Sequence, residues 1–175
     1  WKMGKKISVD SATMMNKCFE IIEAKNIFDI SYQKINIIIH PDSYAHAIIE
    51  YNNGLFKIIF HETTMKIPIF NTIFSKNEIY IPNNKLNYNK LNNLKFQNIS
   101  IKKYPVMNIM RSLPTKHSMF ETILVSVNDT VVDSYLNNKI KFSKISKMIL
   151  NFANKKEFKK YKKIYPKSID EIINL

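Results

Sequence analysis

The sequence predicts an α+β protein in three parts: an α/β layer over residues 1–74, a connecting arm over 75–104 and an α-helical bundle over 105–175. Three observations support this prediction. A β-rich run and a hairpin signal lie in the first part, and polar Asn- and Lys-rich stretches interrupt the second. In the third part, apolar residues recur at three- and four-residue spacing, which is typical of amphipathic helices. At 175 residues and 45% hydrophobic, the chain can bury a core.

The chain opens with a predicted loop over residues 1–6, in which Gly4 is a hinge. Ser11, a residue type that caps helices, precedes a helix predicted over 12–26. At about 100° per residue, one face of this helix is apolar and carries Met15, Cys18, Phe19 and Ile22. The opposite face is polar and carries Asn16, Lys17 and Glu20.

The polar face of this first helix has the composition of an anion site. A serine hydroxyl, free backbone N–H groups, an amide and an ammonium gather at the N-terminus, so Ser11, Asn16 and Lys17 suit an anion such as phosphate. Glu20 adds a carboxylate about one turn further on. The alternative is an ordinary amphipathic helix whose polar face meets water. The tryptophan and methionine beside the hinge glycine favour a site, because they suit a surface loop only where it closes over something.

The middle elements of the first part are read from β-propensity and turn chemistry. Residues 35–39 form a β-rich run that predicts a buried strand. Residues 45–51 and 55–60 flank an Asn-Asn-Gly run at 52–54, which predicts a hairpin because Asn and Gly accept the positive φ of a tight turn. Residues 65–74 predict a short helix.

The third part reads as a series of helices. They are predicted over 106–112, 118–136, 143–152 and from 169 onward, with Ser118 and Ser143 as caps of the second and third. The basic stretch at 155–163 interleaves lysines with aromatics, and a solvated helix face or loop is favoured there over a binding patch.

The net charge of +13 invites a nucleic-acid function, but the kind of charge argues against it. Arg111 is the only arginine, so the surface lacks the bidentate forks that base and phosphate recognition favour. We expect no nucleic-acid partner, although a basic nucleic-acid module stays an alternative. We also expect no membrane partner, because no stretch approaches the ~18 uninterrupted apolar residues of a membrane span.

The single cysteine and the four histidines indicate little chemistry of their own. Cys18 cannot form an internal disulfide, and on an apolar helix face it is expected in the core. His40 and His46 flank a turn without a cysteine partner, which favours structural hydrogen bonding over zinc. Glu20 by itself is not a metal site, since hard divalent cations need several oxygen ligands. The start at Trp1, inside a predicted loop, leads us to expect a piece of a longer protein.

One long motif carries a family resemblance. The run Trp-x-Met-Gly-Lys-Lys-Ile-Ser-Val-Asp-Ser-Ala-Thr-Met-Met-Asn-Lys at 1–17 resembles the active-site segment of the 1-deoxy-D-xylulose 5-phosphate reductoisomerase family. Weaker motifs follow in the family's order and spacing, at 39–43 with His46, 65–69, 94–96, 104–105 and 137–142. The similarity therefore runs through the whole chain.

The resemblance implies roles for the residues of the polar helix face. Ser11, Asn16 and Lys17 would bind the substrate phosphate. Glu20 would be one of three carboxylates on Mg²⁺ or Mn²⁺ and would also touch the substrate. Trp1 would cover the substrate as part of a mobile flap.

The resemblance also implies a cofactor, NADPH. Met3 belongs to the family's flap, Gly4 would let that flap approach NADPH, and Met65 matches a methionine beside the nicotinamide. His46 matches a histidine important for activity. The implied reaction is a metal-assisted carbon-skeleton rearrangement followed by hydride transfer from NADPH.

The implied architecture is the C-terminal part of an α/β catalytic domain, then the arm and a truncated helical domain, in a homodimer of the bacterial cytoplasm or a plastid. The family's N-terminal NADPH domain and two further metal carboxylates are absent from the chain. Cys18 stands where the family usually has glycine, Thr63 where it often has proline, and Asp129 where it usually has glutamate. The alternative function is an inactive remnant that binds phosphate or serves as a scaffold.

Overall fold

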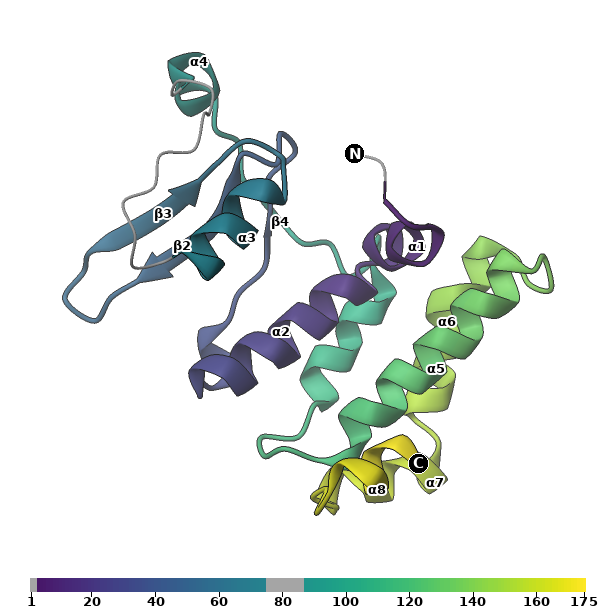
Figure 1. Cartoon of the computed structure of the whole chain (residues 1–175). Coiled ribbons are helices and arrows are strands. Elements are labelled where there is room, and N and C mark those ends of the chain that lie inside the picture. The colour runs from purple at the N-terminus through teal and green to yellow at the C-terminus, as the bar shows by residue number, and fades with distance from the viewer. Residues whose placement is uncertain (1–2, 75–86) are drawn as a thin grey trace. The chain divides into compact units, whose positions relative to one another are not determined.

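The structure is a computed structural model that describes residues 3–74 and 87–175 (Figure 1). Its helices are α1 (Lys5–Thr13), α2 (Met15–Phe28), α3 (Lys66–Ile73), α4 (Tyr88–Asn92), α5 (Met119–Leu136), α6 (Ile145–Ala153), α7 (Lys156–Lys159) and α8 (Ile169–Ile173). Its strands are β1 (Ile38–Ile39), β2 (Ala45–Glu50), β3 (Phe56–Phe60) and β4 (Gln97–Asn98). Short 3₁₀ helices cover Tyr32–Lys34, Pro105–Ser112, Phe142–Lys144 and Lys160–Lys163. The protein is therefore a helix-rich α+β chain, as predicted.

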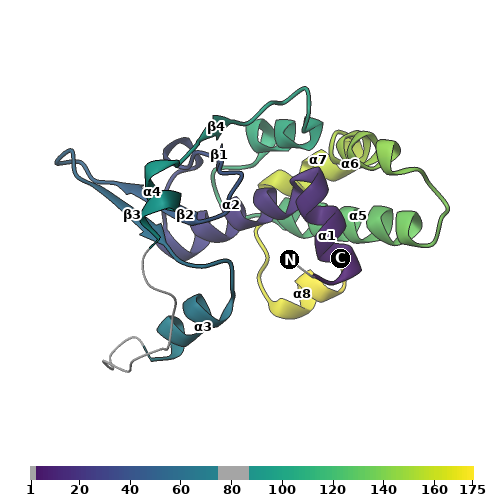
Figure 2. The same cartoon turned by 90° about the horizontal axis from the view of Figure 1, so that it is seen from above.

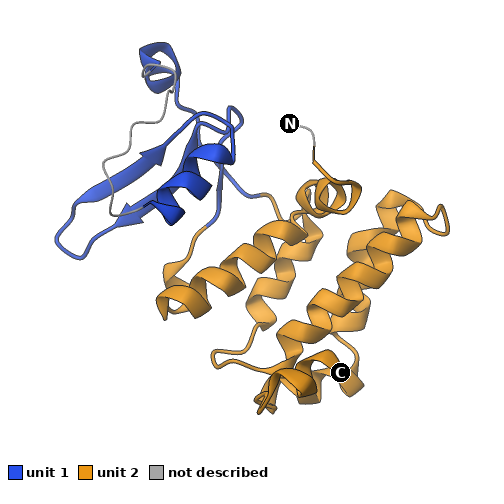
Figure 3. Ribbon diagram, viewed as in Figure 1, with its two compact units in different colours: residues 1, 37–99 blue, residues 2–36, 100–175 orange. Residues whose placement is uncertain are grey.

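The chain divides into two compact units (Figure 3). The first, which we call the hairpin unit, spans residues 37–99, and the second, the helical unit, joins residues 2–36 to residues 100–175. Residues 2–36 belong to the helical unit because α1 packs on α5 and α2 packs on the 3₁₀ helix Pro105–Ser112. The division into domains at 1–74, 75–104 and 105–175 stays a prediction.

The core of the helical unit is apolar and comes from segments distant in sequence. α5 and α6 lie side by side in both views (Figures 1 and 2), and both pack against α7. The largest fully buried apolar side chains of the described residues are Met15, Val106, Ile109, Phe120, Leu124, Val132, Ile145 and Ile149. Each fully buried side chain of this size contributes about 1.5–3 kcal/mol through removal of apolar surface from water. This shared core holds α2 in place.

The N-terminal segment departs from the prediction. The expected loop over 1–6 is wrong from Lys5 onward, because α1 begins there, and Ser11 is no cap because it lies inside α1. The single expected helix is two helices, separated at Met14, which adopts left-handed φ 68° and ψ 12°. α1 forms because its inner side, with Val9 buried, packs on α5, and that contact is invisible in local spacing.

The hairpin unit confirms the turn prediction. β2 and β3 pair antiparallel from Ala45↔Phe60 to Glu50↔Phe56, and Gly54 has the positive φ of 84° that the turn requires. The helix predicted over 65–74 is confirmed as α3. Of the predicted arm, residues 75–86 lie outside the described residues, and α4 and β4 occupy part of the rest.

The buried strand predicted over 35–39 is wrong. Only Ile38–Ile39 of this run form a strand, β1, and within residues 3–74 and 87–175 its one strand partner is β4, which pairs antiparallel with it. The strand is not buried, because Ile38 is 43% exposed and Ile39 is half-buried. Among the described residues of this unit, Tyr44 is the one buried hydrophobic side chain.

The two predicted serine caps have different outcomes. Ser118 is the N-cap of α5, where its Oγ accepts from the N–H of Phe120 and donates to Glu121 Oε2 at 2.5 Å. Ser143 is no cap, because it lies within a 3₁₀ helix and α6 has Lys144 at its N-cap.

No helix of the described residues is long and apolar enough to span a membrane.

Candidate functional site

The break between α1 and α2 places the predicted anion-binding residues. Ser11 lies in the last turn of α1, and its carbonyl accepts a 3.2 Å hydrogen bond from the N–H of Met14. Asn16 and Lys17 lie in the first turn of α2. Because Met14 is left-handed, α2 starts a new helix with its own N-terminus, and Met14 contributes no side-chain cap. The first turn of α2 therefore carries the polar side chains of Asn16 and Lys17.

Three of the predicted site residues contact one another on α2. Asn16 Nδ2 donates to Glu20 Oε1 at 2.6 Å, and Lys17 Nζ lies 2.5 Å from Glu20 Oε2. The spacings of four and three residues place these side chains on neighbouring turns of one face. The predicted polar face of the helix is therefore confirmed as a cluster, and the opposite face buries Met15 and Cys18.

The cluster remains accessible to solvent. The side chains of Lys17 and Glu20 are 41% and 44% exposed, so both can exchange their contact for a ligand. An ammonium and an amide can donate to an anion, and a carboxylate can supply oxygen to a hard cation. Among the described residues, no group of three His, Cys, Asp or Glu side chains is arranged to hold a metal ion. Glu20 can therefore serve as one ligand of a larger set.

Cys18 is a core residue, as predicted. Its side chain is fully buried, and Sγ lies 3.8 Å from Met107 Sδ on the 3₁₀ helix Pro105–Ser112. Burial disfavours the charged thiolate and raises the pKa of Cys18 to about 12. A thiol with this pKa is not a nucleophile at neutral pH.

His46 lies in the hairpin unit, on β2. Its ring stacks on His61 with centroids 3.5 Å apart and an interplanar angle of 5°. Its Nε2 donates to the carbonyl oxygen of His61 at 3.0 Å, and it must be the donor because a carbonyl only accepts. His40 bonds to the carbonyl of Lys95 through Nδ1 at 2.9 Å, which agrees with the structural hydrogen bonding expected for it. One face of the His46 ring is covered by the ring of His61. The residue is nevertheless exposed, so a ligand can reach its side chain.

The predicted cofactor-side residues are spread over both units. Met65 lies in the hairpin unit at the N-cap of α3, is 52% exposed, and lines a groove of about 570 Å³ with Ile69, Phe70, Ile73 and Phe74. Met3 is 38% exposed in the helical unit, and Gly4 is the N-cap of α1 with φ −58°. Trp1 lies outside the described residues.

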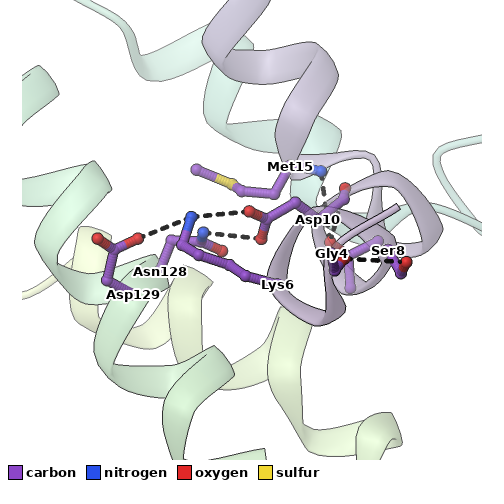
Figure 4. A network of polar contacts seen from close by, with 8 residues as sticks. Gly4, Lys6, Ser8, Asp10, Met15, Asn128 and Asp129 are labelled. Carbon is purple, nitrogen blue, oxygen red and sulfur yellow. Dashed lines mark hydrogen bonds and ion pairs between the residues drawn. The ribbon is translucent and has the colours of Figure 1, made fainter. Parts of the chain in front are cut away.

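A buried polar network beside the site was missed in the sequence. Asp10 is 2% exposed, yet its carboxylate accepts from Lys6 Nζ and from Asn128 Nδ2, each at 2.9 Å (Figure 4). Lys6 also pairs with Asp129 at 3.0 Å. The one local signal was the i, i+4 spacing of Lys6 and Asp10, which has meaning only on a helix, and none was predicted there.

The fold and these residues define a class: a helix-rich α+β region that carries part of a ligand site, with donors for an anion and one oxygen ligand for a cation. The comparisons with known proteins give the family. The family model of the DXP reductoisomerase C-terminal domain matches residues 61–175, and that of the 1-deoxy-D-xylulose 5-phosphate reductoisomerase C-terminal domain matches residues 1–28. The chain belongs to the 1-deoxy-D-xylulose 5-phosphate reductoisomerase family.

Individual relatives agree with this assignment. The 1-deoxy-D-xylulose 5-phosphate reductoisomerase of Pelagibacter ubique is 50% identical over 175 residues, which are 100% of this chain and 45% of that protein. That of Wolbachia pipientis is 39% identical over 180 residues, covering 100% of this chain and 44% of the relative. The chain thus spans less than half the length of the curated relatives it matches.

Solved structures give the same result. A crystal structure of DOX-P reductoisomerase in complex with NADPH, fosmidomycin and magnesium matches with a TM-score of 0.89 and 29% identity, over 99% of this chain and 44% of that one. The Zymomonas mobilis 1-deoxy-D-xylulose 5-phosphate reductoisomerase in complex with NADPH matches with a TM-score of 0.81 and 28% identity, over 97% and 43%.

Proposed function

We propose that the intact protein carrying this chain is an NADPH-dependent reductoisomerase that converts 1-deoxy-D-xylulose 5-phosphate to 2-C-methyl-D-erythritol 4-phosphate in non-mevalonate isoprenoid biosynthesis. The observation that carries the proposal is the contact of Asn16, Lys17 and Glu20 on one face of α2, in a chain of this family. The 175-residue chain by itself would be inactive, because Glu20 would supply only one of the several oxygen ligands that a hard divalent cation needs.

The start of α2 would bind the substrate phosphate. Ser11 offers a hydroxyl, Asn16 an amide and Lys17 an ammonium, and the helix N-terminus adds a favourable field for a negative charge. Without ligand, the amide and the ammonium donate to Glu20, so phosphate binding exchanges these contacts for contacts with phosphate oxygens. Holding the phosphate in this way would orient the substrate for the reaction.

Glu20 would supply one oxygen ligand to Mg²⁺ or Mn²⁺ and touch the substrate beside it. Its carboxylate is half-exposed, and its two partners are side chains of the preceding turn of the same helix, so it can turn to a cation without loss of fold. A bound divalent cation would polarise the substrate carbonyl. The chemistry of the donor fits, and the remaining oxygen ligands would come from elsewhere in the intact protein.

The flap and the hairpin unit would serve the cofactor side. Trp1 would cover the substrate and exclude water, and Met3 and Gly4 would approach NADPH. Met65 would lie beside the nicotinamide, which agrees with its exposed place in an apolar groove. His46 would act near the substrate, held by its ring contact with His61.

The proposed assembly is a homodimer, and the proposed location is the bacterial cytoplasm, with a plastid as the alternative in a eukaryote.

The test is NADPH oxidation by the intact protein with 1-deoxy-D-xylulose 5-phosphate and Mg²⁺. Lys17→Ala should raise KM, and Glu20→Gln should lower kcat/KM, each by at least about a hundredfold, because charged contacts to a transition state are worth several kcal/mol. Direct binding of Mn²⁺, followed by electron paramagnetic resonance, should weaken in Glu20→Gln.

Matched controls come from exposed residues of the same types. Glu23→Gln on α2 and Lys147→Ala on α6 should keep wild-type kinetics. If wild-type protein turns over the substrate while Lys17→Ala and Glu20→Gln behave like these controls, the site assignment fails. Absence of any substrate-dependent NADPH oxidation by the wild type would overturn the function itself.

A further inference from the structure

Met14, the residue between α1 and α2, adopts a strained backbone conformation that its surroundings must stabilise. Met14 has φ 68° and ψ 12°, a left-handed conformation that costs a non-glycine residue about 1–2 kcal/mol. Such strain persists only where surrounding contacts enforce it. The direction in which α2 leaves the break decides where Asn16, Lys17 and Glu20 lie.

A chain of hydrogen bonds reaches this break from α5 (Figure 4). Asn128 Nδ2 donates to Asp10 Oδ1 at 2.9 Å. The backbone carbonyl of Asp10 accepts from Thr13 Oγ1 at 3.2 Å, and the same Oγ1 accepts from the N–H of Met15 at 3.4 Å. The path thus ends on the first residue of α2.

The members of this path are buried. Asn128 is 0% exposed, Asp10 2% and Thr13 4%. Buried hydrogen bonds are shielded from competing water, and a carboxylate taken out of water must keep its donors. Lys6 supplies the second donor to Asp10 at 2.9 Å, so both carboxylate oxygens are engaged. The carboxylate cannot rotate without losing one of them.

We propose that Asp10, Thr13 and Asn128 are positioning residues that hold the break at Met14 and so set the direction in which α2 presents its polar face. The expected effect on substrate binding rests on the proposed function. Neither Thr13 nor Asn128 belongs to the polar cluster of α2; they act through the backbone that carries Asn16, Lys17 and Glu20.

The sharpest test is Thr13→Val in the intact protein, with Thr13→Ser as the conservative variant. Valine keeps the shape and removes the hydroxyl that links Asp10 to Met15, and serine restores it. Two quantities are measured: amide hydrogen exchange at residues 15–18, and the steady-state constants for 1-deoxy-D-xylulose 5-phosphate. Exchange in α6 reports whether the fold is intact.

Thr13→Val should speed exchange at 15–18 and raise KM, each about tenfold, with kcat changed much less. Thr13→Ser should return both to near wild type. Asn128→Ala should give the same pattern from the far end of the path, while Ser126→Ala, an exposed residue of α5, should give none of it.

Wild-type exchange at 15–18 and wild-type KM in Thr13→Val, with α6 intact, would overturn the inference. A drop in kcat alone, with KM and local exchange unchanged, would also overturn it, because that pattern reports a smaller folded fraction. If the wild type shows no turnover, the proposed function fails, and the exchange result alone decides the positioning role.

Discussion

The amide of Asn128 donates a 2.9 Å hydrogen bond to the carboxylate of Asp10 across 118 positions of sequence. Both side chains are buried, and they join α5 to α1 inside the helical unit. A buried charge held in this way contributes little when paired and costs much when one partner is removed. This asymmetry leads to the first prediction.

Asn128→Leu should lower the free energy of unfolding by about 2 kcal/mol, because it leaves Asp10 short of a charge-assisted hydrogen bond. Urea denaturation of the intact protein at neutral pH measures the difference. Ser126→Ala, on an exposed position of the same helix, should stay within about 0.5 kcal/mol of wild type. Equal unfolding midpoints for Asn128→Leu and wild type would contradict the prediction.

Lys6 should make stability depend on alkaline pH. Burial lowers the pKa of its ammonium, but the hydrogen bonds and charges of Asp10 and Asp129 outweigh this and hold the pKa above its ordinary value of 10.5. The folded state therefore binds the proton more tightly than the unfolded state. The stabilisation is complete below that ordinary value and is lost as pH rises through the folded pKa.

Lys6→Met removes this dependence. Urea unfolding from about pH 8 to about pH 11 should show the stability gap between wild type and Lys6→Met narrowing at the alkaline end. Lys5→Met, an exposed neighbour on the same helix, should run parallel to wild type. A gap between wild type and Lys6→Met that is constant with pH would show that the network does not depend on the charge of Lys6.

Substitution of the two serines predicted as caps should lower the free energy of unfolding by different amounts. Ser118→Ala should lower the free energy of unfolding by about 1 kcal/mol, because it leaves the N–H of Phe120 without its acceptor. Ser143→Ala, at an exposed position that caps no helix, should change it by less than about 0.5 kcal/mol. Thermal or urea unfolding of the pair checks the difference, and equal losses would refute the cap assignment.

Cys18 should resist alkylation in the native protein. Its burial and a pKa of about 12 leave almost no thiolate at pH 8. Iodoacetamide labelling of the intact protein, read by mass spectrometry of the Cys18 peptide, should show little modification. The same peptide should label fully in urea, which is the control for access, and rapid native labelling would contradict the buried position.

Local chemistry predicted much of this structure because some signals lie entirely within a short segment. The Asn-Asn-Gly turn needs only the positive φ that Gly54 accepts, and the cap of α5 needs only Ser118 and the residues after it. The polar face of α2 follows from helical spacing alone, which brings Lys17 and Glu20 into contact whatever surrounds them.

The errors lie where distant segments decide the outcome. The sequence predicts a loop up to residue 6, although α1 begins at Lys5, because the packing of α1 on α5 and the bond of Asp10 to Asn128 cannot be read from neighbouring residues. The sequence predicts a buried strand over 35–39 because its isoleucines suit a covered sheet, yet the strand covers only Ile38–Ile39 and Ile38 is 43% exposed. Propensity sets what a segment can form, and tertiary contacts decide whether that form is covered.

Sequence by itself therefore determined the family, the polar face of α2 and the residues that make up the candidate site. Only the tertiary structure decided that this face begins a second helix after a left-handed Met14, and that a buried path from Asn128 through Asp10 leads to it. The physical reason is range: side-chain type and helical spacing act over a few residues, whereas burial and the pairing of a buried carboxylate require partners that only the folded chain brings together.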